Sequence, residues 1–134
     1  MNPNATNNTN KVLHKELSYK LNGIMFHVQN GLGRFCREHQ YQDALEKEFI
    51  QQQIPYKREF PIPLSTDIKV PSNKVDFIVD KKILIDLKAK SIITKEDYFQ
   101  MKRYLEASNM ELGLIVNFRN RRLYIKRILR PNHL

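Results

Sequence analysis

The run of residues 74–90 is the feature that most constrains the fold of this chain. It predicts two strands, at 75–79 and 83–89, because both segments are rich in β-branched residues and a short polar turn separates them. Successive side chains of a strand point to opposite faces, so Asp86 and Lys88 leave the second strand on the same side. A carboxylate and an ammonium therefore project together from a strand that is otherwise almost wholly apolar.

The register of this hairpin decides whether Asp76 joins the pair. If the turn consists of residues 80–82, Val79 faces Ile83 and Asp76 lies directly opposite Asp86, whereas a slip of one residue would send Asp76 to the other face. In the first register the two carboxylates stand about 5 Å apart, and like charges so placed destabilise a sheet unless something positive lies between them. A divalent cation bound by oxygen ligands would supply that charge.

A simpler interpretation of the hairpin stays open at this point. An aspartate followed after nine residues by Asp-x-Lys occurs by chance in many chains. Asp86 and Lys88 could form an ordinary ion pair on a solvent-facing hairpin, and such a pair contributes only about 0–1 kcal/mol. The spacing alone does not separate this ion pair from a metal site.

The charge of the chain points to a polyanionic partner. With 23 basic and 14 acidic residues its formal net charge is +9, and small basic domains most often bind nucleic acid. The distribution adds to this, because no carboxylate side chain follows Glu111. The residues expected to contact nucleic acid lie in this last segment and are Arg119, Arg121, Arg122, Tyr124, Lys126 and Arg127.

The composition is typical of a single soluble domain made and kept in the cytoplasm. Hydrophobic residues make up 41% of the 134 residues and charged residues 28%, and no apolar run approaches the roughly 20 residues that span a bilayer. Cys36 is the only cysteine, so neither a disulfide nor a cysteine-based zinc site can form within the chain. We expect an asparagine-rich disordered tail at 1–11, one domain at 12–130 and a short C-terminal tail at 131–134.

Two amphipathic helices are predicted before the first strand, at about 12–30 and 34–52. Glu38 falls on the apolar stripe of the second helix, where a carboxylate must find a cation, a hydrogen-bond donor or a proton. It could pair with Arg34 or Arg37, or it could deliver a further carboxylate to a metal site. The helical spacing leaves both interpretations open.

The rest of the chain alternates between strands and one more helix. Period-two patterning predicts a strand at 53–62 and another at 122–129, and the short apolar run 112–118 predicts an inner strand. A helix is predicted at about 94–109, after an N-cap threonine followed by acidic residues. Gln100 shares the sheet-facing stripe of this helix, where it could satisfy a backbone group or help position a water or lysine in an active site.

The combined order of helices and strands resembles the restriction-endonuclease-like fold, an α/β fold in which helices flank a mixed β-sheet and a hairpin carries metal ligands. The order is two helices, three strands, a helix and two strands (ααβββαββ). In detail the chain resembles the GxxExxY family of the PD-(D/E)XK nuclease superfamily. The resemblance covers most of residues 12–129, and the segments that carry it are 31–41, 75–77, 85–89, Gln100, 104–105 and 112–118.

This resemblance implies an enzyme that hydrolyses phosphodiester bonds of nucleic acid with the help of Mg²⁺ or Mn²⁺, with DNA as the expected substrate. It implies that Asp76 and Asp86 bind the metal and that Lys88 stabilises or orients the attacking water. Glu38 would support the metal site from its helix, and Gln100 would line it.

Three departures from the patterns are visible. Val75 stands where the superfamily has proline, Asp86 where it usually has glutamate, and Phe35 where the GxxExxY pattern has its glycine. A non-catalytic or partner-dependent nucleic-acid-binding module on the same fold is the alternative hypothesis, although such a module has no reason to keep the like-charged pair. A homodimer or a larger complex is compatible with so small a domain.

Overall fold

The computed structural model describes residues 13–63 and 73–131 of the chain. The tail predicted at 1–11, most of the connecting loop between the first two strands and the last three residues lie outside this part. Among the helices that the structure describes, none is long and apolar enough to cross a membrane.

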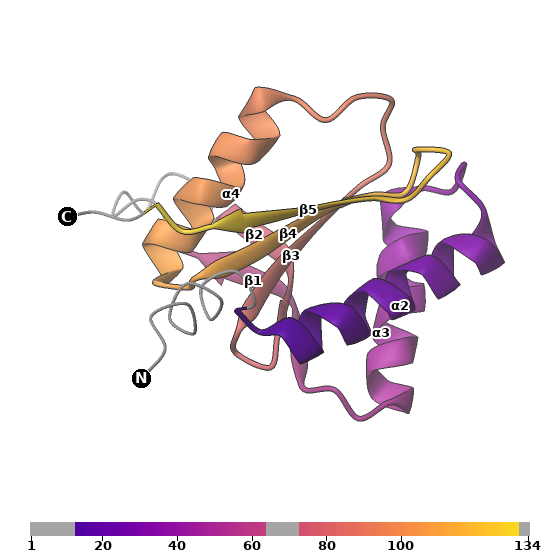
Figure 1. The fold of residues 1–134 in the computed structure, drawn as a ribbon, viewed down its shortest axis with the longest axis horizontal. Helices are drawn as coiled ribbons and strands as arrows, with labels where there is room; N and C mark the ends of the chain where they lie inside the picture. Colours follow the sequence, from indigo (N-terminus) through magenta and orange to yellow (C-terminus); the bar gives the residue numbers. More distant parts are fainter. Residues whose placement is uncertain (1–12, 64–72, 132–134) are drawn as a thin grey trace, which may run out of the picture.

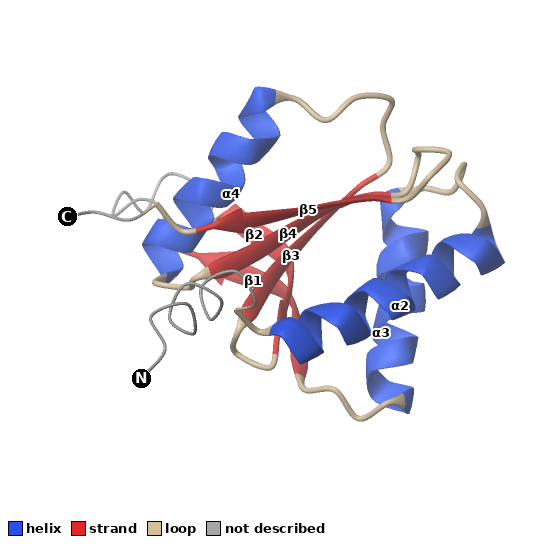
Figure 2. Cartoon of the chain, viewed as in Figure 1, coloured by secondary structure: helices blue, strands red, loops and turns tan. Residues whose placement is uncertain are grey.

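The described residues form the predicted order of two helices, three strands, one helix and two strands (Figure 2). The elements are α2 (Lys15–Leu32), α3 (Glu38–Gln51), β1 (Tyr56–Ile62), β2 (Asn73–Val79), β3 (Ile83–Lys88), α4 (Lys95–Ser108), β4 (Leu112–Asn117) and β5 (Tyr124–Leu129).

The five strands make one mixed sheet in the order β1-β2-β3-β4-β5. Only β3 and β4 pair in parallel, and α4 is the crossover between them, whereas the other neighbours are antiparallel. Helices α2 and α3 cover one face of the sheet and α4 covers the other (Figure 1). The predicted mixed sheet flanked by helices is therefore confirmed.

The two faces of the sheet carry separate hydrophobic cores. On one face, buried residues of α2 and α3 pack against the strands, and this first core includes Leu21, Met25, Tyr41, Leu45, Phe49, Phe77, Ile85, Leu114 and Val116. On the other face α4 packs against a second core that includes Ile78, Leu84, Met101, Tyr104, Leu105, Ile115 and Ile128. The inner strand β4 is buried along its whole length, as its apolar run predicted.

The connection between α2 and α3 differs from the predicted boundaries. Helix α2 continues to Leu32 and ends at Gly33, whose φ of 79° is the left-handed conformation that glycine adopts most easily. Helix α3 begins at Glu38 rather than near residue 34, because Arg37 is extended and its backbone N–H donates to Oε1 of Gln40. Glu38 therefore stands at the very start of α3.

The hairpin of β2 and β3 has the register that the sequence predicted. Val79 pairs with Ile83, and the backbone N–H of Lys82 donates to the carbonyl oxygen of Val79 at 2.9 Å. Asp80 and Lys81 both have positive φ, at 51° and 53°, as in the turns that suit the twist of antiparallel strands. This turn fixes which side chains of the two strands face one another.

Candidate active site

The strand alternation of β2 is interrupted at Asp76. Its two neighbours along the strand, Val75 and Phe77, are only two positions apart, yet Val75 packs in the core beneath α4 and Phe77 in the core beneath α2 and α3. Opposite this point in β1, Glu59 lies between the paired residues of the ladder and has φ of 54°. A local twist of both strands therefore frees the Asp76 side chain from either core and lets it reach β3.

Two hydrogen bonds hold the Asp76 carboxylate. The backbone N–H of Leu87 donates to Oδ2 at 2.6 Å, and Nε2 of Gln42, in α3, donates to Oδ1 at 2.7 Å. Gln42 is itself fixed, because its Oε1 accepts a hydrogen bond from Nη2 of Arg58, in β1, at 3.0 Å. Asp76 is thus anchored to β3 through the backbone of Leu87 and to α3 through the side chain of Gln42.

Asp86 completes a carboxylate pair. The β2–β3 ladder ends at the pair of Phe77 and Ile85, and just beyond it the carboxyl groups of Asp76 and Asp86 lie within hydrogen-bond reach of one another. Asp86 is only 8% exposed. Burial raises the pKa of Asp76, and the charge of Asp86 raises it further, to about 8, although the Leu87 amide acts in the opposite direction. At neutral pH the pair therefore favours holding a proton or a cation between its oxygens.

Lys88 lies beside this pair. Its Nζ is 3.0 Å from Oδ2 of Asp86 and 3.9 Å from Oδ1 of Asp97, and its side chain is 17% exposed. Burial would lower the pKa of Lys88, but the carboxylates of Asp86, Asp97 and Glu38 raise it above its ordinary value. Lys88 is therefore a cation at neutral pH, and it acts through its charge and its N–H groups.

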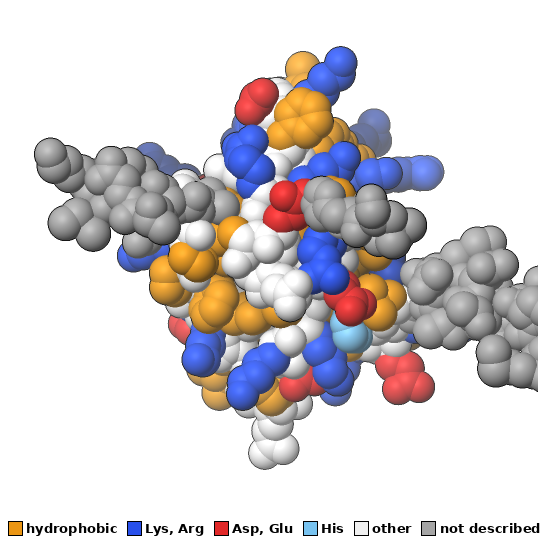
Figure 3. Space-filling view, turned by 90° about the vertical axis from the view of Figure 1, so that its left-hand side faces the viewer, with side chains coloured by type: hydrophobic (Ala, Val, Ile, Leu, Met, Phe, Trp, Pro, Cys, Tyr) orange, Lys and Arg blue, Asp and Glu red, His pale blue; other side chains and the backbone are white. Residues whose placement is uncertain are grey.

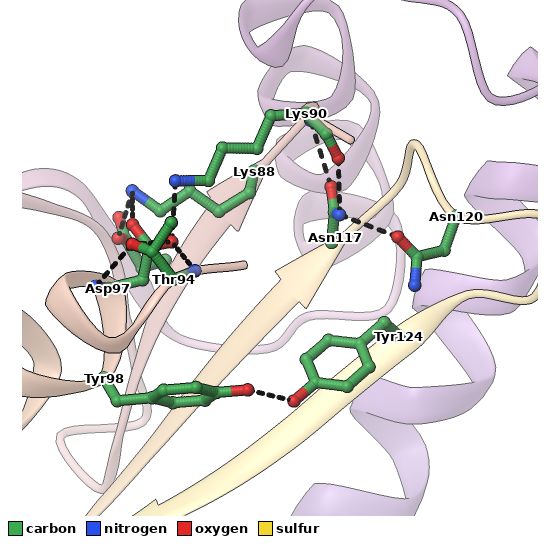
Figure 4. A network of polar contacts seen from close by, with 9 residues as sticks. Lys88, Lys90, Thr94, Asp97, Tyr98, Asn117, Asn120 and Tyr124 are labelled. Carbon is green, nitrogen blue, oxygen red and sulfur yellow. Dashed lines mark hydrogen bonds and ion pairs between the residues drawn. The ribbon is translucent and has the colours of Figure 1, made fainter. Parts of the chain in front are cut away.

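Asp97 brings α4 to the site, which the sequence did not predict. Lys88 and Lys90 both reach Asp97 at the start of this helix (Figure 4), and Nζ of Lys90 lies 2.6 Å from Oδ2. Burial would raise the pKa of Asp97, but Lys90 and the hydrogen bonds from Thr94 lower it. A permanently charged carboxylate thus holds two ammonium groups at one edge of the site.

The segment after β3 is fixed by Asn117, at the end of β4. Asn117 is fully buried, and its Nδ2 donates to the carbonyl oxygen of Lys90 at 2.7 Å while its Oδ1 accepts from the Lys90 N–H at 3.2 Å. The same side chain donates to Asn120 (Figure 4). This clamp sets the backbone from which Lys88 and Lys90 extend.

Glu38 stands at the rim of the site. Partial burial raises the pKa of Glu38, Lys88 lowers it and Asp86 raises it, so the carboxylate is electrostatically linked to the pair. It forms no ion pair with Arg34 or Arg37, both of which the structure describes. Within residues 13–63 and 73–131, however, no three side chains of His, Cys, Asp or Glu are grouped closely enough to hold a metal ion.

Gln100 is half-buried on α4 and forms no hydrogen bond with any residue that the structure describes. Asp97, one turn earlier on the same helix, makes the contact to Lys88 instead. The proposed roles of Gln100 and Glu38 thus stay predictions.

The basic residues expected to bind nucleic acid do not share one surface. Arg127 packs against α2, where it donates to Oγ of Ser18 at 2.9 Å and to the carbonyl oxygen of Leu13 at 3.0 Å. Tyr124 bonds through its hydroxyl to that of Tyr98, on the face covered by α4 (Figure 4), and burial together with this bond raises the pKa of Tyr124 to about 12. Arg119 lies in the β4–β5 turn.

The surface beside α4 carries mixed charges. Lys and Arg side chains are spread over this face among acidic and hydrophobic ones, and they do not merge into one basic patch (Figure 3). Positive charge is therefore dispersed on this face.

Gln42 and Asp97 are the site residues that sequence reasoning missed. Gln42 falls four residues after Glu38 on the same helical stripe, so its direction was visible, but the strand that it meets was not. Asp97 was recognised as an acidic residue near a helix start, on the same helical stripe as Gln100, but its role was explained by the local contact with Thr94.

The donor set of the site suits a hard divalent cation. Carboxylate oxygens are the ligands that Mg²⁺ and Mn²⁺ prefer, and burial together with the charge of Asp86 raises the pKa of Asp76 even though Lys88 lies 3.0 Å from Asp86. Mg²⁺ commonly takes one or two protein carboxylates and completes its shell with water and substrate phosphates. Asp76 and Asp86 fit this pattern without a third carboxylate.

The comparisons with known proteins identify the superfamily of the chain. A family description of the PD-(D/E)XK nuclease superfamily matches residues 15–128, which include every side chain of the site. The chain therefore belongs to the PD-(D/E)XK nuclease superfamily, as its motifs predicted. Members of this superfamily generally use divalent metal ions on nucleic-acid substrates. No curated protein matches the sequence.

Two solved structures resemble the fold. One, described as SSO0001, is 19% identical with a TM-score of 0.54 and covers 69% of this chain and 49% of its own. The other is an alkaline exonuclease (LHK-Exo) from Laribacter hongkongensis, which is 15% identical with a TM-score of 0.48. The match covers 64% of this chain and 52% of the exonuclease chain. This chain thus spans about half the length of each neighbour. The observed order of helices and strands, the family match and the likeness to SSO0001 confirm the restriction-endonuclease-like fold.

Proposed function

We propose that the chain is a Mg²⁺-dependent nuclease, able to use Mn²⁺ instead, that hydrolyses phosphodiester bonds of DNA. Within the superfamily we assign it to the GxxExxY family. The observation that carries the proposal is the contact between the carboxyl groups of Asp76 and Asp86 at the β2–β3 hairpin, with the Lys88 ammonium 3.0 Å from Asp86. A hairpin on the surface needs neither the burial of Asp86 nor the twist that frees Asp76.

The proposed chemistry divides between the carboxylate pair and the lysine. A divalent ion bound by Asp76 and Asp86 would polarise the scissile phosphate and lower the pKa of a bound water. Asp76 is held for this task by Leu87 and Gln42, so its oxygens need no reorganisation when charge develops.

Lys88 has the protonation state of a charge-stabilising group. Because neighbouring carboxylates raise its pKa in the metal-free protein, the amine carries a proton at neutral pH and is suited to donate hydrogen bonds. Its N–H groups would instead stabilise the negative charge that builds on the phosphate oxygens in the transition state. Asp97 shares Lys88 with Asp86 and keeps the ammonium at the edge of the pair.

A cleavage assay with one isosteric substitution tests the proposal. The full chain is incubated with labelled single-stranded and duplex DNA, with Mg²⁺, Mn²⁺ or EDTA, beside the variants Asp86→Asn and Asp80→Asn. Asp80 lies in the turn of the same hairpin, and its side chain forms an ion pair with Lys82 at 3.4 Å, away from the carboxylate pair, so Asp80→Asn is the matched control. We expect metal-dependent cleavage by the wild type and by Asp80→Asn, and none by Asp86→Asn.

Two results would contradict the proposal. Cleavage retained by Asp86→Asn would assign the activity to another site or a contaminant. DNA binding by the wild type without product under any metal would favour the alternative of a binding module, or of a subunit that cleaves only with a partner.

A further inference from the structure

Phe35 is a large aromatic side chain that the fold leaves exposed beside the candidate active site. It lies in the link between α2 and α3 and is 74% exposed. An isolated exposed aromatic needs no explanation. Phe35 differs because two arginines flank its ring, Arg34 with its guanidinium carbon 4.8 Å from the ring centroid and Arg119 at 5.5 Å.

Reciprocal hydrogen bonds fix these two arginines. Nε of Arg34 donates to the carbonyl oxygen of Arg119 at 2.8 Å, and Nε of Arg119 donates to the carbonyl oxygen of Arg34 at 3.1 Å. Each arginine uses only Nε in these bonds. In the part of the chain that the structure describes, their remaining guanidinium nitrogens have no acceptor, so they are available to an anion.

The backbone beneath Phe35 is rigid as well. Tyr41 stacks on Phe118 with ring centroids 4.1 Å apart, and its hydroxyl donates to the carbonyl oxygen of Gly33 at 2.6 Å and accepts from the Cys36 N–H at 3.2 Å. Gln29 ties the end of α2 to the β4–β5 turn through the carbonyl oxygen of Phe118. The α2–α3 link and the β4–β5 turn are thus joined, and they lie side by side in Figure 1.

Phe35 and Arg119 line a cavity that continues to the candidate active site. The cavity has a volume of about 620 Å³, and its wall also includes Glu38, Gln42 and Ala89. Gln42 is the residue that hydrogen-bonds Asp76, and Ala89 follows Lys88 directly. The volume lies within the range of about 300–1,000 Å³ that is usual for small-ligand sites. An unstacked nucleotide adjoining the scissile phosphate would occupy it.

We propose that Phe35, flanked by Arg34 and Arg119, is a stacking platform for an unpaired base next to the bond that the chain cleaves. This inference rests on the proposed function, which supplies DNA as the substrate class. It goes further because it names single-stranded DNA or frayed DNA ends as the preferred substrate. The part of the phenyl ring that the two guanidinium groups leave exposed offers a base-stacking surface, and the free guanidinium nitrogens offer contacts to the flanking phosphates. A base inside a duplex is already stacked on both sides and cannot use the platform.

Equilibrium binding without metal tests this platform separately from cleavage. Fluorescence anisotropy in EDTA is measured with a single-stranded DNA about ten nucleotides long, within the usual site size of such binders, and with the blunt duplex of the same sequence. The variants are Phe35→Ala, Phe35→Trp and Phe99→Ala. Phe99 is the matched control, since it is 46% exposed and has the Lys102 ammonium 6.0 Å from its ring centroid.

We expect Phe35→Ala to weaken binding of the single strand by about 5- to 100-fold, the usual effect of losing one base–aromatic stack. Phe35→Trp retains the affinity, Phe99→Ala leaves it unchanged, and duplex binding changes by less than about two-fold in all variants. A 2-aminopurine in the strand should be quenched by the wild type and not by Phe35→Ala. A single-stranded RNA arm shows whether the sugar matters to the platform.

Unchanged single-strand affinity in Phe35→Ala would overturn the inference, as would an equal loss in Phe99→Ala or an equal loss on the duplex. Because Phe35 is exposed, its truncation leaves both cores intact. Failure of the wild type to cleave DNA would overturn the proposed function but leave this binding result standing. Cleavage by both the wild type and Phe35→Ala, with equal affinity for the single strand, would overturn the stacking platform but leave the proposed nuclease function standing.

Discussion

Gln42 donates a 2.7 Å hydrogen bond from Nε2 to Oδ1 of Asp76, joining residues that stand 34 positions apart in the sequence. Arg58 holds the amide of Gln42 in the orientation that this bond needs, by donating to Oε1 at 3.0 Å. The orientation of the Asp76 carboxylate is therefore fixed by Gln42 of α3, which is in turn held by Arg58 of β1.

The variant Gln42→Ala tests this positioning. It removes a donor from a buried carboxylate, so we expect metal affinity to fall by about 10- to 100-fold, the usual effect of losing an outer partner of a metal ligand. Calorimetric titration with Mn²⁺ measures the affinity. The control is Gln52→Ala, because Gln52 bonds only Glu48 at the surface in this way. Equal affinity in both variants would show that Asp76 needs no support from α3.

The variant Lys88→Met separates charge stabilisation from metal binding. Removing a cation that stands 3.0 Å from Asp86 does not weaken the attraction of the carboxylate pair for a divalent ion, so metal affinity should stay equal or rise. The cleavage rate should fall by about 100- to 1,000-fold, as when one donor to a developing oxyanion is lost. Rates are measured at saturating Mg²⁺, with Lys82→Met, on the exposed turn, as the control. Loss of metal binding together with cleavage would contradict this division of roles.

The stability of the metal-free protein should depend on pH through Asp76. Folding raises the pKa of Asp76 from 3.8 to about 8, first by burial and then by the charge of Asp86. Between these values the folded state binds more protons than the unfolded state, so this group makes stability fall as pH rises from about 4 to about 8.

Urea unfolding at pH 5.5 and pH 8.5 in EDTA measures this dependence, with the pH values chosen to bracket the upper part of that window. The wild type should lose more stability over this interval than Asp76→Asn does, and the control Asp80→Asn should behave as the wild type. Mg²⁺ should restore stability at the higher pH, because the cation takes the place of the proton. Parallel curves for wild type and Asp76→Asn would contradict the raised pKa.

Gly113 tests how closely α4 packs on β4. A Cβ at this position would collide with Met101, 2.8 Å from Cγ and closer still to Sδ, and Met101 is 1% exposed. Gly113→Ala should therefore destabilise the fold by about 1–3 kcal/mol, the usual result of overpacking a core. Gly23→Ala, in the middle of α2 with nothing within 4 Å of the new Cβ, should instead stabilise by roughly 0.5–1 kcal/mol. Similar free energies of unfolding for both variants would show that Met101 moves away freely.

The parts of the structure that local sequence determines were predictable. The turn at 80–82 fixes the pairing of Val79 with Ile83 and of the two following residue pairs, as the sequence predicted. Helical spacing predicted the amphipathic helix α2, and an apolar run identified β4 as the inner strand. These features depend on neighbours within one element or one hairpin.

The rest of the site depends on contacts between distant elements. The twist at Asp76 arises where residues of β2 pack into both cores, and no residue type in β2 predicts it. Gln42 and Asp97 reach the site because α3 and α4 cross the sheet at particular angles, which a helical pattern does not contain. The α3 boundary was misplaced because Arg37 and Gln40 form a cap that lacks the usual residue types.

The most direct test of the account is a calorimetric titration of the purified chain with Mg²⁺ and with Mn²⁺ at neutral pH, comparing the wild type with Asp86→Asn and Asp80→Asn. The account predicts saturable binding that Asp80→Asn keeps and Asp86→Asn loses, because Asp76 and Asp86 supply the oxygen ligands that face one another across the hairpin. Equal binding by the wild type and Asp86→Asn, or no binding by the wild type, would contradict the claim that this carboxylate pair is a metal site.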